Sequence, residues 1–193
     1  MSRTRKFLCG LAFMLAVAPA GASTFARVGL DYLVAENGLV VVGEVVGTRS
    51  YWNDPGTLIL TDVQIAVSEI LKGKLADHEI TVTIPGGTVG DDTVAMIGGA
   101  ELLPGNAYVL FLEKGDLPGV SGVRVVRDLS QGVFEIRMNK GGLRAVSQAN
   151  RLELVADALG KAVPPGGAQG LGFQELRQSV RDLVARGARK EVK

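Results

Sequence analysis

Short apolar runs separated by turn signals are the feature that most constrains how this chain can fold. The runs between residues 39 and 138 are rich in Val, Ile and Leu, and several alternate apolar with polar side chains. A period of two is typical of a half-buried strand. Turn signals such as "NDPG" recur about every 8 to 12 residues, and no helical pattern of useful length lies between the runs. The sequence therefore predicts a mainly β fold, a sandwich or a small barrel, rather than a parallel βαβ sheet.

The individual runs predict where the strands lie. They cover residues 39–51, 57–73, 80–84, 108–115, 122–126 and 131–138, and residues 141–146 are a further short candidate. Near Glu69 the alternation of the second run shifts, which indicates the end of the strand or a bulge. Gly43 and Gly47 in the first run indicate close backbone contact, bending or a bulge. The apolar face of the run at 131–138 consists of Phe134, Ile136 and Met138.

Helical patterns occur on either side of the strand region. A short helix is predicted at residues 30–35, ended by Asn37-Gly38, and a second at residues 150–163. Residues 164–172, "PPGGAQGLG", have the composition of a linker. A last helix follows, and its apolar stripe consists of Phe173, Leu176, Val180, Leu183 and Val184. This stripe either packs on the barrel or docks a partner, and we favour packing because an unpaired apolar stripe promotes aggregation.

The first 22 residues have the three parts of a secretory signal peptide. Basic residues precede an apolar run at residues 7–18, and Ala20-Gly21-Ala22 fits a cleavage site. The apolar run is shorter than the roughly 20 residues that a membrane-spanning helix needs. We therefore expect an exported protein, secreted or periplasmic, that begins near Ser23 and has no membrane span after cleavage.

Removal of the signal would change the charge and the cysteine content. Lys plus Arg falls from 21 to 18 while Asp plus Glu stays at 20, so the mature chain is near −2. This charge argues against a nucleic-acid partner, which requires a basic face. Cys9 is the only cysteine and lies in the signal, so the remaining 171 residues (193 minus 22) contain no thiol or disulfide. A chain of this size can bury a core without disulfides.

The glycine-rich stretch "IPGGTVGDDTVAMIGG" resembles a ligand loop at first sight. A phosphate loop would continue with Lys and Ser or Thr and open a helix, and this stretch does neither. Pro85-Gly86-Gly87 and Gly98-Gly99 are therefore interpreted as sharp turns or bulges with positive φ. Asp91 and Asp92 are two neighbouring acids without the further oxygen ligands that calcium requires, so a solvated loop tip is predicted.

The other signatures of an enzyme are weak. His78 is the only histidine and lies in the polar segment "KLADHE", without a nucleophile motif such as G-x-S-x-G in the chain. A catalytic zinc normally takes three protein ligands, often histidines, so neither a metal nor another cofactor is expected. A hydrolase with a carboxylate pair remains the alternative, since sequence does not show which acids meet in space.

The segment at residues 50–54, "SYWND", is the strongest candidate for a recognition surface. Tyr51, Trp52, Asn53 and Asp54 lie beside a turn, and Trp52 is the only tryptophan of the chain. Exposed Trp and Tyr are favoured at protein interfaces. The competing interpretation is that Trp52 covers one end of the barrel, because a chain with few aromatic residues needs bulk in its core.

Several motifs together resemble a set of uncharacterised secreted bacterial proteins. They are "VVVGEVVGTRSYW", "VSEILKG", "ITVTIPGG", "PGNAYVLFLEKG" and "LSQGVFEIR", in this order within residues 30–138. The resemblance implies a small antiparallel barrel of the OB-fold type, similar to the netrin-like module of the tissue inhibitors of metalloproteinases. Those inhibitors depend on an N-terminal cysteine and on disulfides, which the mature chain lacks, so no functional residue is carried over.

The combined prediction is a signal peptide at 1–22, a β-barrel domain at 23–147 with a short N-terminal helix, and a C-terminal helical extension at 148–193. We expect an exported, non-enzymatic module that binds a periplasmic or extracellular protein or another ligand. A hydrolase and a structural protein of the cell envelope are the alternatives.

Overall fold

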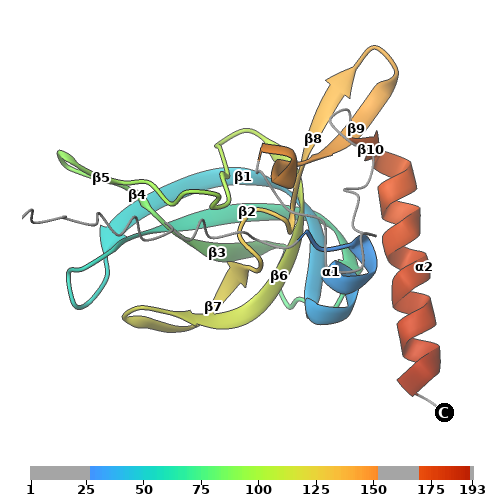
Figure 1. The fold of residues 1–193 in the computed structure, drawn as a ribbon, viewed down its shortest axis with the longest axis horizontal. Coiled ribbons are helices and arrows are strands. Elements are labelled where there is room, and N and C mark those ends of the chain that lie inside the picture. Colours follow the sequence, from blue (N-terminus) through green and yellow to red (C-terminus); the bar gives the residue numbers. More distant parts are fainter. Residues whose placement is uncertain (1–26, 152–169, 192–193) are drawn as a thin grey trace, which may run out of the picture.

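The computed structural model describes residues 27–151 and 170–191, which form a curved antiparallel sheet with two helices at one end (Figure 1). The elements are, in chain order, α1 (Leu30–Glu36), β1 (Leu39–Trp52), β2 (Ile59–Lys72), β3 (Glu79–Pro85), β4 (Gly87–Val89), β5 (Asp92–Val94), β6 (Ala107–Leu117), β7 (Val120–Val126), β8 (Val133–Asn139), β9 (Gly142–Ser147), a 3-10 helix (Gln148–Arg151), β10 (Leu171–Gly172) and α2 (Phe173–Glu191). The predicted mainly β fold with a short N-terminal helix and a C-terminal helix is confirmed. None of the helices in these residues combines the length and the apolar character that crossing a bilayer would require.

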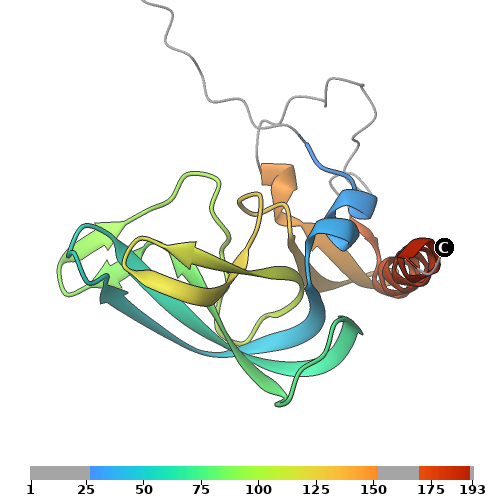
Figure 2. The ribbon, with the colours of Figure 1, turned by 90° about the horizontal axis from the view of Figure 1, so that it is seen from below.

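The strand pairing curls the sheet into a barrel. β3, β2, β1 and β6 are antiparallel neighbours in this order, and β6 also pairs with β7. β7 in turn lies beside β3, so the two ends of the path meet (Figure 2). β8, β9 and β10 continue the sheet from β6 towards α2. The closer likeness to an OB-type barrel stays a prediction, with which this closure is compatible.

Bulges bend the two longest strands. Val42 pairs with Glu69 and Gly43 with Val67, so Ser68 is left out of the ladder. The predicted irregularity near Glu69 is thus a bulge and not the end of the strand. A Cβ on Gly43 would lie 2.5 Å from Ile65 Cγ2 and 2.8 Å from the carbonyl oxygen of Ala66. Only glycine fits there, as the close contact expected at this position requires.

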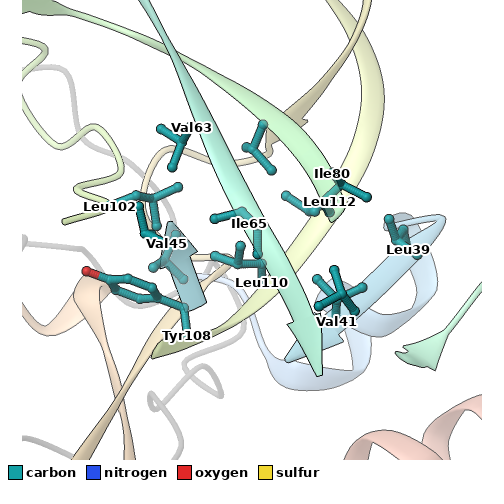
Figure 3. Packing of buried hydrophobic residues seen from close by; sticks show 13 residues of the cluster. Leu39, Val41, Val45, Val63, Ile65, Ile80, Leu102, Tyr108, Leu110 and Leu112 are labelled. Carbon is teal, nitrogen blue, oxygen red and sulfur yellow. The ribbon is translucent and has the colours of Figure 1, made fainter. Parts of the chain in front are cut away.

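Two apolar cores lie on the two faces of the sheet. The inner core fills the barrel and is shown in Figure 3; its members include Leu39, Val41, Val63, Ile65, Val82, Leu110 and Leu112. The outer core lies between the sheet and the helices, and its members include Val40, Val109, Phe111, Phe134, Leu176 and Val180. Neighbours in the sequence such as Val40 and Val41 enter different cores because side chains of a strand alternate between its faces.

The C-terminal helix α2 packs on the barrel. Leu176 and Val180 are fully buried in the outer core, and Phe173, Leu183 and Val184 pack against it. The stripe that sequence periodicity indicated therefore belongs to the domain, as the packing interpretation predicted. The end of the predicted linker differs from expectation, because Leu171 and Gly172 pair with Ala145 and Arg144 of β9 as a short strand.

Two further predictions required correction. β6 does not end at Gly115 but continues through an irregularity to Leu117. The glycine-rich stretch does contain turns with positive φ at Gly86, Gly87 and Gly98, but β4 and β5 form a separate hairpin between them. Gly99 has no positive φ. The signal peptide at 1–22, most of the linker and most of the helix predicted at 150–163 lie outside the described residues.

Candidate functional site

Two turns that are far apart in the sequence meet at the end of the barrel where β1 ends. Asn53 connects them and is only 3% exposed. Its side-chain oxygen accepts hydrogen bonds from the N–H groups of Thr57 (2.8 Å) and Leu58 (2.9 Å), and its Nδ2 donates to the carbonyl oxygen of Pro118 (3.0 Å). A Cβ on Gly119 would lie 2.8 Å from Pro55 Cδ, which shows how closely the β6–β7 turn packs on the β1–β2 turn (Figures 1 and 2). We call this pair of turns, residues 53–58 and 118–119, the tip.

The tip holds Trp52 at the surface. Trp52 pairs with Ile59 as the last rung of the β1–β2 ladder, and the residue is 40% exposed. Asp54, in the turn itself, is also exposed. With this exposure Trp52 is not a buried core residue, and its pairing with the buried Ile59 places it at the end of the barrel.

Tyr51 is part of a polar row across the outer surface of β1, β2 and β3. Its hydroxyl donates to Asp62 Oδ1 (3.2 Å), and Thr83 Oγ1 donates to the same oxygen (2.7 Å). Burial, followed by the nearby charge of Asp62, raises the pKa of Tyr51. The phenol therefore stays protonated at neutral pH and serves as a hydrogen-bond donor.

The structure thus divides the four predicted binding residues. Trp52 and Asp54 face solvent, Tyr51 is half-buried, and Asn53 is buried with its polar atoms engaged. Asn53 is consequently a structural residue and not a contact for a partner. An asparagine directly before Asp-Pro-Gly is typical of a turn whose side chain bonds backbone groups that follow it, and this signal could have identified its role.

Of the hollows on the described part of the molecule we consider three, and Tyr51, Trp52, Asn53 and Asp54 line none of these. The first, of 330 Å³, is at the mouth of the barrel where β1 begins, and sequence reasoning missed it. The second lies beneath the β4–β5 hairpin, and the third lies between α1 and α2. The mouth is lined by Gly38, Leu39, Lys74, Leu75, Leu112, Glu113, Lys114 and Arg124.

Several acidic groups are engaged in structural contacts. Glu69 pairs with arginines of α2, and Glu113 and Glu36 both lie near Arg127, at 3.2 and 3.6 Å. His78 is exposed in the bend that precedes β3. Within residues 27–151 and 170–191, no three His, Cys, Asp or Glu side chains gather in a way that could hold a metal ion.

Asp128 differs from the other acids. It has a φ of 54°, and its buried Oδ2 receives no hydrogen bond from any described residue. Burial, together with the charge of Glu36, raises the pKa of Asp128 against the opposing effect of Arg127. A carboxyl with a raised pKa is what a hydrolase would need, but Asp128 lines none of the three hollows.

In comparisons with known proteins, no family model and no curated protein match the chain.

Proposed function

We propose that this protein is an exported, non-enzymatic β-barrel module that binds a periplasmic or extracellular protein through the surface around Trp52. The observation that carries the proposal is the 40% exposure of Trp52 beside a turn fixed by buried Asn53. Aromatic residues make up 5% of this chain. A core built from so few aromatics would gain from a buried indole, and the chain instead keeps its only tryptophan at the surface.

The rigidity of the tip supports the same proposal. Hydrogen bonds between the Asn53 side chain and both turns fix the backbone around Trp52 before any partner arrives. Binding to a preformed surface costs less conformational entropy than binding to a flexible loop. Tryptophan is also among the residue types that contribute most at the centres of protein interfaces. Export itself rests on the signal-like residues at 1–22.

The test is a capture experiment on the exported proteins of the source cells, with the wild-type chain as bait. We expect Trp52→Ala to lose the captured partner. Tyr32→Ala is the matched control, because Tyr32 is 38% exposed on α1, at the other end of β1. Both variants should melt at nearly the wild-type temperature, since surface substitutions usually change stability little.

Fluorescence gives an independent measurement. Because Trp52 is the only tryptophan, the tryptophan emission of the chain reports only on the surface at the end of β1, next to the tip. Titration with the captured partner should shift this emission towards shorter wavelength as the indole leaves water. Equal capture by Trp52→Ala and wild type, unchanged emission, or the absence of any specific partner would each contradict the proposal. Recovery of the chain only in the insoluble envelope fraction would favour the structural alternative.

A further inference from the structure

We propose that the mouth of the barrel is a second binding site, separate from the tip, and that it takes an amphiphilic anion. The apolar body of the ligand would rest on Leu39, Leu75 and Leu112, and its anionic head would lie among Lys74, Lys114 and Arg124. The hollow measures 330 Å³, at the small end of the range for ligand pockets, and barrel mouths are a common position for such pockets. Leu39 begins β1 and Trp52 ends it, so the two sites lie at opposite ends of the strand.

Strand alternation explains how cations come to line the mouth. Tyr108, Leu110 and Leu112 of β6 all belong to the inner core, and Lys114 is the next residue of this row. On β7, Val126 packs against the inner core, and Arg124, opposite Lys114, is the next residue on the same face in the direction away from this core. Both rows therefore change from apolar to cationic where the barrel opens.

Two of the cations lie where their charges repel each other and lower the stability of the sheet. Lys114 and Arg124 are direct cross-strand partners in the β6–β7 ladder. Like charges in this position destabilise a sheet, whereas an acid opposite a base would stabilise it. Among the described residues, neither side chain has an ion-pair partner, and Lys74 has none either. These three cations therefore form no ion pair that would stabilise the fold. A cluster of unpaired cations is the arrangement that a binding site for an anion requires.

The one acid of the mouth does not neutralise the cluster. Glu113 Oε2 lies 3.2 Å from Arg127 Nη1, so its charge is already paired. The positive charges of Lys74, Lys114 and Arg124 thus remain available to a ligand.

The floor of the mouth determines which anion fits. Leu112 is fully buried, Leu39 is nearly so, and Leu75 packs against the inner core. An inorganic anion would leave this leucine floor in contact with water, and an uncharged apolar molecule would leave the cations unused. A carboxylate, sulfate or phosphate head on a short alkyl body uses both parts of the site.

The experiment is a calorimetric titration of the full exported chain at low salt, with octyl sulfate below its micelle concentration. Octanol and inorganic sulfate serve as the comparison ligands, and octanoate and octyl phosphate compare the head groups. We expect one octyl sulfate per chain, and binding of octanol and of inorganic sulfate weaker by roughly tenfold or more. Methyl NMR signals of Leu39, Leu75 and Leu112 should shift on binding.

The double variant Lys114→Gln with Arg124→Gln should lower the affinity for octyl sulfate by roughly tenfold or more. The variant should melt at the same temperature as the wild type or a higher one, because the substitutions remove a like-charge pair. The control is Lys140→Gln with Arg49→Gln, which removes the same charge from exposed positions that do not line the mouth and should bind as the wild type does. Equal weakening by both pairs, octanol binding as tightly as octyl sulfate, or methyl shifts confined to the groove between α1 and α2 would overturn the proposal. The Trp52 capture experiment is independent of each of these results.

Discussion

The guanidinium of Arg177 in α2 makes a two-point contact with the carboxylate of Glu69 in β2. Arg177 Nη2 donates to Glu69 Oε1 at 2.8 Å, and Nε lies 2.7 Å from Oε2. Arg181, one turn further along the helix, contacts the same carboxylate. The guanidinium carbon of Arg177 also lies 5.4 Å from the centre of the Phe173 ring. These contacts fix α2 at the point where β2 bulges beside Ser68.

The first prediction concerns this ion pair. In a double-mutant cycle of Glu69→Gln with Arg177→Met, we expect a coupling free energy of about 1 kcal/mol. This is above the usual value for an exposed pair because the guanidinium lies close to both carboxylate oxygens and both side chains are only 21% exposed. Urea denaturation gives the four unfolding free energies. The control is Glu79→Gln, a substitution at an exposed acid of β3. Its coupling free energy with Arg177→Met should be zero within error. A zero value for the Glu69 cycle would show that α2 is held by apolar packing alone.

The second prediction concerns the apolar face of α2. Leu176 is fully buried in the outer core. Leu176→Ala should lower the free energy of unfolding by about 2–5 kcal/mol, because it removes buried methyl groups and leaves a cavity. Met138→Ala is the control, since Met138 is 72% exposed and should change stability little. A variant Leu176→Ala as stable as the wild type would mean that the helix does not pack on the barrel in solution.

The third prediction compares two glycines. Gly43→Ala should destabilise the protein by about 1–3 kcal/mol, because the added methyl group would overlap Ile65 and the backbone of Ala66. Gly187→Ala, in α2, meets no atom within 4 Å and should stabilise the helix by about 0.5–1 kcal/mol. Thermal melting followed by circular dichroism measures both changes. Similar effects of the two substitutions would contradict the close packing of β1 on β2.

The fourth prediction concerns the pH dependence of stability. Because burial raises the pKa of Asp128, the folded state holds this proton more tightly than the unfolded state does. Its contribution to stability is therefore greatest below the ordinary pKa of aspartate and falls as the pH rises through the raised value. Asp128→Asn keeps a residue type that tolerates positive φ and removes the charge. The substitution should raise the melting temperature at neutral pH. It should also reduce the decrease in stability that the wild type shows as the pH rises above about 4.

The control for this prediction is Asp91→Asn, at the exposed end of the β4–β5 hairpin. It should leave the pH profile of the melting temperature unchanged. If Asp128→Asn also left the profile unchanged, or lowered the melting temperature at neutral pH, the carboxyl would be better stabilised in its charged form than its burial indicates.

The elements of this fold could be predicted from the sequence because their signals are local. Alternation with a period of two marked the strands, and a helical stripe marked the packed face of α2, including Leu176 and Val180. Glycines gave the positions of turns and of the close contact at Gly43. Local periodicity gave a wrong prediction of burial on the β8–β9 hairpin. Met138 continues the apolar row of Phe134, yet Met138 is 72% exposed.

Only the tertiary structure decided which of these elements meet. Asn53 lies 65 residues from Pro118, and Arg177 lies 108 residues from Glu69, yet each pair is in hydrogen-bond contact. The cations of the mouth likewise come from two local units that lie apart in the sequence, the β2–β3 connection with Lys74 and the β6–β7 hairpin with Lys114 and Arg124. A periodic pattern reports which face of an element is apolar, because that depends on neighbours in the chain. The partner of that face depends on how distant elements pack together, and so the tip and the mouth appear only in the folded molecule.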